Sequence, residues 1–275
     1  MKFYLSSKIK KIVKITSIVI LAVTVIIFWV VVSCLFIDEW PSNNKDKSDC
    51  NVANIKLYGD LYTYVKETDD CKDCASSEEV VNQIRDAEAN NDIKAILLTI
   101  DSTGGNPVAA EEIANTLKQA SKPTVALIRS SGDSGAYFAA TGAERIFASD
   151  MSDVGSIGIT SSYVDNSKKN QKDGLTYNSL SLGKYKDTGN PDKPLTDEEK
   201  KMILNDLQVG YDIFIKNVAN NRHLDIEKVK VLADGNSMDG QKALDNGLID
   251  QLGSLSDVET YLANKIGGET LYVCR

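Results

Sequence analysis

One nearly uninterrupted apolar segment, residues 93–100, constrains the fold of this chain more than any other feature. It reads Ile-Lys-Ala-Ile-Leu-Leu-Thr-Ile. Such a run is expected of a strand that is covered on both faces, as the strands of parallel sheets are. The sequence therefore predicts that this strand lies near the centre of a sheet flanked by helices.

Strand-like and helix-like segments alternate around this strand, which predicts an α/β architecture with a mostly parallel sheet. Ser76 and Glu79 have the spacing of a capping box, and Asn106 followed by Pro107 supplies a helix N-cap and a first helical residue. The C-terminal part is predicted to be mainly helical. The predicted strands are 54–58, 93–100 and 124–128, and the predicted helices are 77–90, 107–120, 196–221, 226–232, 241–246 and 255–265.

An uncharged stretch rich in Ile, Val and Leu, residues 15–37, precedes all of these elements. Its length of about 23 residues lets a helix cross a bilayer core about 30 Å thick. Five lysines and no acidic residue come before it, so the positive-inside rule places the N-terminus in the cytoplasm. The predicted order is a cytoplasmic N-terminus (1–14), a transmembrane anchor in the membrane lipid (15–37), a linker (38–52) and one extracytoplasmic domain (53–275).

Two alternatives to an uncleaved anchor stay open. Residues 31–34, Val-Val-Ser-Cys, loosely resemble a lipoprotein processing box with Cys34 as the lipidated residue. A cleaved signal peptide would release the domain, but the apolar run is longer than the roughly 7 to 15 residues usual in such peptides. Two of the three interpretations attach the protein to a membrane.

The charge balance after residue 14 is strongly acidic. This part of the chain has 26 basic and 39 acidic residues, a net charge of about −13. An acidic surplus argues against binding to a phosphate backbone. Nucleic acid is therefore not an expected partner.

Four cysteines lie outside the predicted anchor, at positions 50, 71, 74 and 274. They form an even number in a compartment where disulfides persist. Cys71 and Cys74 have Cys-x-x-Cys spacing, but there is no second such pair, and His223 is the single histidine. We expect a structural disulfide or free surface thiols, and we predict no metal or other cofactor.

A pair of glycines follows the central strand. Residues 101–106 read Asp-Ser-Thr-Gly-Gly-Asn, directly before a predicted helix. Gly104 and Gly105 allow a tight turn whose N–H groups face a crevice, reinforced by the helix N-terminus. Such a turn can form an oxyanion hole, although the pattern also fits an ordinary strand-to-helix turn.

Ser134 lies between the strand 124–128 and a segment of small residues. A serine on a sharp strand-to-helix turn exposes its Oγ as a nucleophile, whereas a helix N-cap is the structural alternative. The usual base would be a histidine, but His223 lies among polar residues between two helices. We expect His223 to be exposed, which leaves a Ser-His-Asp triad with little support.

A lysine can replace histidine if it is neutral near pH 7. Its ordinary pKa of about 10.4 must then be lowered to about 7 by desolvation and by neighbouring groups. Lys184 and Lys186, in Gly-Lys-Tyr-Lys-Asp, are the candidates. Either of them also fits a solvated surface lysine.

Six motifs in a fixed order resemble the signal peptide peptidase A family of membrane-bound Ser/Lys peptidases, which have the ClpP/crotonase fold. The likeness extends over about residues 53–265. The motifs are Asp-Ser-x-Gly-Gly, Ser-Gly-x-Tyr, Gly-Ser-Ile-Gly, Gly-Lys-Tyr-Lys-Asp, Ala-Asp-Gly at 233–235 and Gly-Leu-Ile-Asp at 247–250.

The resemblance implies a role for each matching residue. Ser134 corresponds to the nucleophile, and Lys186 corresponds to the general base. Ser156 matches the hydroxyl that orients the lysine amine, and Gly105, preceded by Gly104, matches the oxyanion-hole amide. These roles agree with a serine attacking a peptide carbonyl while a neutral lysine takes its proton.

Two positions depart from the family pattern. Asp133 stands directly before the serine, where the family commonly has a small residue, so a carboxylate lies beside the site. Thr103 replaces the usual proline of the Gly-Gly turn. Asp133 motivates an alternative in which the chain is a non-catalytic membrane scaffold or adaptor of the same fold.

The resemblance implies a membrane-anchored serine endopeptidase that cleaves remnant signal peptides and other unfolded or membrane-released polypeptides outside the cytoplasm. Family members form rings in which neighbouring units complete each other's sites. A chain with one unit implies a homo-oligomeric ring, for example an octamer. A crotonase-like thioester enzyme is a further alternative, which the outward topology disfavours because acyl-CoA substrates are cytoplasmic.

Overall fold

The computed structural model describes residues 21, 23–28, 50–66, 71, 73–268 and 270–274. The chain divides into two units, Met1–Ser48 and Asp49–Arg275, and the fold below is that of the second. Most of the predicted anchor and linker lies outside the described residues, although Leu21 and residues 23–28 are helical. Among the residues that are described, no helix has the length and apolar character needed to cross a bilayer.

The described part of the second unit is built on an eight-stranded sheet, in the order β2-β1-β3-β4-β5-β8, with β6 paired to β4 and β7 paired to β6. Every pairing is parallel except that of β6 with β7. This arrangement confirms the predicted mostly parallel α/β sheet. The strands are β1 (Val52–Tyr62), β2 (Cys74–Ser76), β3 (Ala95–Gly105), β4 (Thr124–Asp133), β5 (Arg145–Ala148), β6 (Asp153–Gly155), β7 (Ser237–Met238) and β8 (Gln251–Leu252).

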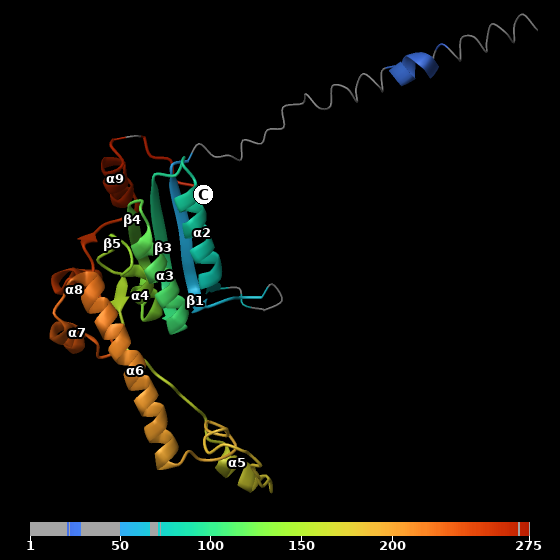
Figure 1. The fold of residues 1–275 in the computed structure, drawn as a ribbon, viewed down its shortest axis with the longest axis vertical. Helices are drawn as coiled ribbons and strands as arrows, with labels where there is room; N and C mark the ends of the chain where they lie inside the picture. Colours follow the sequence, from blue (N-terminus) through green and yellow to red (C-terminus); the bar gives the residue numbers. More distant parts are fainter. Residues whose placement is uncertain are drawn as a thin grey trace, which may run out of the picture. The chain divides into compact units, whose positions relative to one another are not determined.

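Helices cover the sheet and dominate the C-terminal part, as predicted (Figure 1). The long α6 extends away from the sheet. The helices are α2 (Ser77–Ala89), α3 (Pro107–Gln119), α4 (Gly135–Ala140), α5 (Ser167–Lys172), α6 (Asp197–Arg222), α7 (Ile226–Leu232), α8 (Gly240–Asn246) and α9 (Leu255–Lys265).

The strand β3 is central and buried on both faces, which confirms the main sequence prediction. Its side chains alternate between two apolar clusters: Ile96 and Leu98 pack with α2, α3 and α4, whereas Leu97 packs with Val258 and Leu262 of α9. Alternation follows from the two-residue period of a strand. Helices therefore pack on both faces of the sheet and hold in place the edge at which its parallel strands end.

Local capping signals begin the helices where the sequence predicts. The Ser76 side chain accepts a hydrogen bond from the Glu79 N–H, and the Asn106 side chain accepts from the N–H groups of Val108 and Ala109. The strand β4 extends five residues beyond the predicted 124–128. The last three of these extra residues pair with the short β6, a partner that the periodicity of β4 alone does not reveal.

Two disulfides occur among the described cysteines. Cys50 bonds with Cys274, and Cys71 bonds with Cys74. Cys50 is buried, and the N–H of Cys274 donates to the carbonyl of Val52 at 2.8 Å. Residues 50–52 therefore belong to the folded unit rather than to the predicted linker, because the C-terminal segment pairs with them.

Candidate active site

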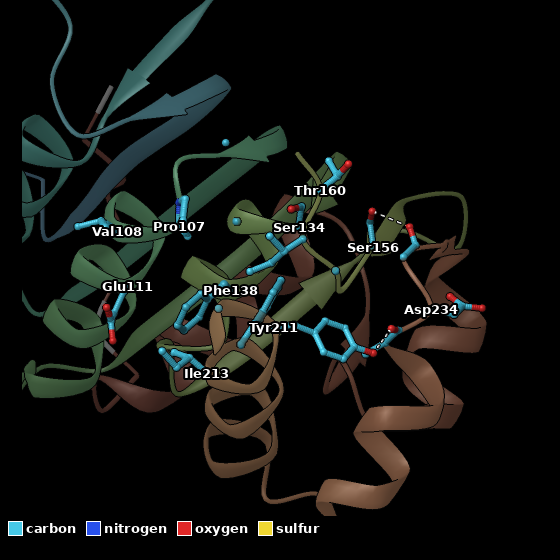
Figure 2. A pocket seen from close by; sticks show the side chains of 18 residues that line it. Pro107, Val108, Glu111, Ser134, Phe138, Ser156, Thr160, Tyr211, Ile213 and Asp234 are labelled. Carbon is cyan, nitrogen blue, oxygen red and sulfur yellow. Dashed lines mark hydrogen bonds between the residues drawn. The ribbon is translucent and has the colours of Figure 1, made fainter. Parts of the chain in front are cut away.

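Ser134 stands where β4 ends and α4 begins (Figure 2). Its backbone has φ 50° and ψ −122°, a conformation that costs a residue with a side chain about 1–3 kcal/mol. Its N–H donates to the carbonyl of Gly155 at 2.7 Å, and its own carbonyl accepts from the Phe138 N–H at 2.9 Å. The side chain does not cap α4. Ser134 thus occupies the N-cap position of α4 without capping it through its side chain, and the residue lines a cavity.

The Gly104-Gly105 turn packs directly against this serine. The φ angles are 100° at Gly104 and 149° at Gly105, both in the region that favours glycine. A Cβ on Gly104 would lie 2.9 Å from the Cβ of Ser134, and one on Gly105 would lie 2.3 Å from the carbonyl oxygen of Leu61. The turn therefore requires glycine at both positions so that β1, β3 and the serine can approach one another.

Two glycines line the cavity beside the serine, Gly105 and Gly135. A Cβ on Gly135 would lie 3.3 Å from the Gly105 nitrogen, so the two residues are in contact. A pair of amides next to a serine hydroxyl can stabilise an oxyanion. Gly135 was not predicted from the sequence, although its position directly after the serine is the usual signal for such an amide.

The cavity has a volume of about 720 Å³. Its walls come from the Gly-Gly turn and α3, from the start of α4, from the turn after β6, and from α6 and the segment that follows α7 (Figure 2). The contribution of α6 was not predicted, because it depends on how a helix distant in sequence packs. The side chains that project into this space are mainly apolar: Val108, Phe138, Ile159, Tyr211, Ile213 and Phe214.

Ser156 also lines the cavity, in the turn after β6. Its φ angle is 48°, which is unusual for a residue with a side chain. The hydroxyl donates to the carbonyl of Gly235 at 3.0 Å (Figure 2). The N–H donates to the carbonyl of Asn236 at 3.0 Å. The fold thus brings Ser134, Gly105 and Ser156 to one cavity.

Lys186 is not among the residues that line this cavity. It is exposed and lies in residues 160–195, here called the extension, which begins at the cavity with Thr160 and continues to the end of α6 away from the sheet (Figure 1). Its side chain makes no hydrogen bond or ion pair with any residue the structure describes, and its N–H donates to the carbonyl of Gly183 at 3.1 Å. The neighbouring Lys184 pairs with Glu198 of α6.

Polar contacts hold the extension together. Tyr177 donates to the carboxylate of Asp187 at 2.9 Å, and Lys193 forms a 2.6 Å ion pair with Glu199 of α6. Glu199 accepts hydrogen bonds from the ion-paired Lys193 and from Thr196. These bonds lower the pKa of Glu199 to about 2, although desolvation has the opposite effect. The α5 helix has no buried side chain. The one buried apolar residue of the extension, Leu195, belongs to neither apolar cluster, so the extension has no apolar core of its own within one chain.

Asp133 is buried at the end of β4 and does not line the cavity. One carboxylate oxygen accepts from the Ser131 hydroxyl at 3.0 Å, and the other has no partner among the described residues. Burial raises the pKa of Asp133, the Ser131 hydrogen bond opposes this effect, and the charge of Asp153 adds to it. A carboxylate next to Ser134 is thus held in a site that disfavours its charge.

His223 is exposed and ends α6 in a left-handed conformation with φ 53°. It does not line the cavity of Ser134, which confirms the expectation of a surface histidine. Within the part of the chain that the structure describes, no three His, Cys, Asp or Glu side chains are grouped so that they could hold a metal ion. The chemistry available at the cavity is that of hydroxyls, amides and carboxylates.

Several known proteins are similar in sequence to about two thirds of this chain. The relatives include a candidate signal peptide peptidase SppA of Enterococcus faecium, 33% identical over 64% of this chain and 52% of its own length. Protease 4 of Salmonella typhi is 34% identical over 64% of this chain and 29% of its own length. The chloroplastic serine protease SPPA of Arabidopsis thaliana is 30% identical over 66% of this chain and 27% of its own length. The matched stretch thus spans about half of the first relative and less of the other two.

The fold and the family models agree with these relatives. A mutant of ClpP1 from Listeria monocytogenes superposes with a TM-score of 0.52 at 13% identity, over 78% of this chain and 97% of that chain. The Clp protease family model matches residues 62–149, and the model of peptidase family S49 matches residues 116–267. The S49 match covers more than half of the chain and includes Ser134, Ser156 and Lys186. The chain therefore belongs to peptidase family S49, as its ordered motifs had indicated.

Proposed function

We propose that this protein is a serine endopeptidase in which Ser134 attacks the peptide carbonyl. The supporting observation is the strained Ser134 backbone, held against the Gly104-Gly105 turn in an apolar cavity. The hydroxyl is available, and the N–H groups of Gly105 and Gly135 stabilise the oxyanion that forms when it attacks. The resulting acyl-enzyme is then hydrolysed by water.

Lys186 is the proposed general base, and we propose that it reaches the serine of another copy of the chain. Within one copy, Lys186 is exposed and outside the cavity lining, and the described residues that line the cavity of the serine include no lysine or histidine. Ser156, whose hydroxyl donates to Gly235 at 3.0 Å, would orient the incoming amine. A homo-oligomeric ring, for example an octamer, repeats this pairing around a closed set of identical interfaces.

The proposed substrates are remnant signal peptides and other unfolded or membrane-released polypeptides. An apolar cavity at the nucleophile suits the apolar side chains that such peptides expose. The lysine-flanked apolar run at residues 15–37 supports a single-pass anchor with the catalytic domain outside the cytoplasm. The anchor would hold the domain at the surface where these peptides emerge.

A mixing experiment tests the nucleophile, the base and their sharing between copies. Ser134→Ala and Lys186→Ala should each reduce peptide cleavage by about 10⁴-fold or more. Co-assembled 1:1, the two inactive variants should recover about a quarter of the wild-type sites, because one variant supplies the serine and the other the lysine. Lys184→Ala, which alters the other lysine of the same motif, is the matched control and should keep its activity.

Each result has a defined meaning. Full activity of either single variant would overturn the corresponding assignment. No recovery on mixing, in oligomers shown to contain both variants, would overturn the sharing of the site. Mass-spectrometric mapping of the products would identify the cleaved bonds.

The alternative is a non-catalytic membrane scaffold of the same fold. Asp133 favours it, because a buried carboxylate beside the serine, with one unpartnered oxygen, is an unusual neighbour for a nucleophile. A serine-directed covalent probe separates the two functions. Labelling of Ser134 in the assembled protein supports the peptidase, whereas failure to label it supports the scaffold.

A further inference from the structure

The charged residues of the cavity are unusual for a largely apolar space. Of the described residues that line it, only Glu111 and Asp234 carry a charge, and both are acidic. Figure 2 shows them on opposite sides of Ser134, Glu111 on α3 and Asp234 on the segment that follows α7. A peptide that crosses the serine would therefore meet a carboxylate on either side of the cleaved bond.

Glu111 is the carboxylate that is free to bind a ligand. It is half-buried, and it makes no hydrogen bond or ion pair with the residues that the structure describes. Its neighbour Glu112 is already engaged, because it accepts from the Ser77 hydroxyl at 2.5 Å. Asp234 accepts from the backbone N–H of Asn236 at 2.9 Å and from its side chain, which keeps the pKa of Asp234 below its ordinary value.

The surroundings of Glu111 suit a long side chain with a charged end. Val108, Phe138 and Ile213 line the same side of the cavity (Figure 2). Lysine and arginine bury their aliphatic stems along apolar surface while their charged ends stay near water or a partner. A half-buried carboxylate beside such a wall provides both contacts, and no basic residue among the described lining residues competes for it.

We propose that Glu111 is a specificity-determining residue that binds a lysine or arginine side chain of the substrate next to the cleaved bond. The inference rests on the proposed peptidase function of the same cavity. The substrate class is a peptide in which a basic residue adjoins apolar residues. Secretory signal peptides have this composition where their basic segment meets their apolar segment. The acidic surplus of the chain after residue 14 would also attract such peptides.

The experiment compares peptides that differ at one position. An apolar peptide cleaved by the wild type is synthesised with Lys, Leu or Glu at each position around the cleaved bond, and kcat/KM is measured for each. At one position the wild type should prefer Lys to Leu. Glu111→Gln should reduce kcat/KM for the Lys peptide by about tenfold, mainly through KM, and leave the Leu peptide nearly unchanged. The Glu111→Lys variant should cleave the Glu peptide in preference to the Lys peptide.

The matched control is Glu259→Gln. Glu259 is also half-buried and makes no hydrogen bond or ion pair with a described residue, but it lies on α9, on the opposite face of the sheet. The same change of charge there should leave the preference intact. High salt provides a test without substitution, because it should weaken the preference of the wild type for Lys.

The possible failures are distinguishable. If the wild type cleaves none of the peptides, or if Ser134→Ala cleaves them equally well, the proposed function fails. If the wild type cleaves them but Glu111→Gln changes the Lys and Leu peptides by the same factor, the role of Glu111 is overturned. A wild-type preference for Lys that salt does not weaken would overturn it as well.

Discussion

The two halves of the proposed active site are built in different ways. Ser134 lies in a backbone that β3, β4 and β6 hold in a strained conformation, among buried residues. Lys186 lies in the exposed extension, whose contacts are mainly polar. Both residues belong to equally recognisable sequence motifs. The comparison teaches that a motif can identify a residue without showing which chain brings it to its partner.

The exposed leucines of the extension indicate that this half of the site lacks a packing partner within its own chain. Leu180 and Leu182 are 100% and 97% exposed, whereas Ile100, in β3 before the Gly-Gly turn, is fully buried. Leaving a large apolar side chain in water forgoes about 1.5–3 kcal/mol relative to burying it. A second copy of the chain that covers these leucines would recover part of this energy and would bring Lys186 with it.

After the loss of the nucleophile or the base themselves, the largest expected effect comes from a pair of glycine substitutions, one in each half. Gly105→Ala should reduce peptide cleavage by about 100-fold or more, because the new Cβ would lie 2.3 Å from the Leu61 oxygen and displace the oxyanion turn. Gly174→Ala, in the extension, has a similarly unfavourable φ of 73° but nothing within 4 Å of the new Cβ. It should cost only about 1 kcal/mol of stability.

Cleavage assays and thermal unfolding of both glycine variants test this contrast. Equal losses of activity in Gly105→Ala and Gly174→Ala would contradict the claim that the glycine turn beside Ser134 has no room for a side chain whereas the extension has. Retained activity in Gly105→Ala would exclude the Gly105 amide from the reaction.

An intermediate effect is expected from the exposed leucines. The double variant Leu180→Ser with Leu182→Ser should unfold at nearly the wild-type temperature, because neither side chain packs within its own chain. It should nevertheless form smaller oligomers and lose activity with them, as measured by sedimentation and peptide cleavage. Met151→Ser, which removes an 87% exposed side chain outside the extension, is the control and should change neither. Wild-type assembly of the double variant would contradict the proposed interface.

The smallest effect is a pair of opposite pH dependences. Burial raises the pKa of Asp133, so its contribution to stability is complete below its unfolded pKa of about 3.9 and is lost as the pH rises through the folded value. Asp133→Asn should therefore raise the unfolding temperature slightly at pH 7. The gain should disappear on acidification.

Asp187, in the extension, should behave in the opposite way. Desolvation tends to raise the pKa of Asp187, but hydrogen bonds from Tyr177, Ser179 and Asn190 together lower it. Its contribution is thus present above the unfolded pKa and is lost as the pH falls through the folded value. Asp187→Asn should lower the unfolding temperature slightly at pH 7 and less at acidic pH. The same sign for both variants would contradict this assignment.

Much of the fold could be predicted because its signals are local. The central strand followed from one apolar run, and α3 begins after Asn106 because that side chain caps it. The short strands β5 to β8 have two to four residues each and were missed, because so few residues show no period. Their existence depends on neighbours that the chain supplies far away.

In the candidate site, too, residues with a local sequence signal were predicted and residues placed by distant packing were not. Ser134, Ser156 and Gly105 were identified from motifs, and the fold gathers them at one cavity. The roles of Gly135 and of Tyr211 and Phe214 in that cavity were not identified. Gly135 was overlooked as an amide donor, whereas the α6 side chains belong to a helix with no motif of its own.

The sequence by itself determined the family, the mostly parallel α/β class and the glycine turn, because periodicity, capping and the conformational freedom of glycine act over a few neighbouring residues. The tertiary structure alone decided that Gly104 meets Ser134 across two adjacent strands, that α6 lines the cavity, and that Lys186 stands apart from it in one chain. These relations depend on strand register and on the packing of distant segments, which no local stretch of sequence encodes.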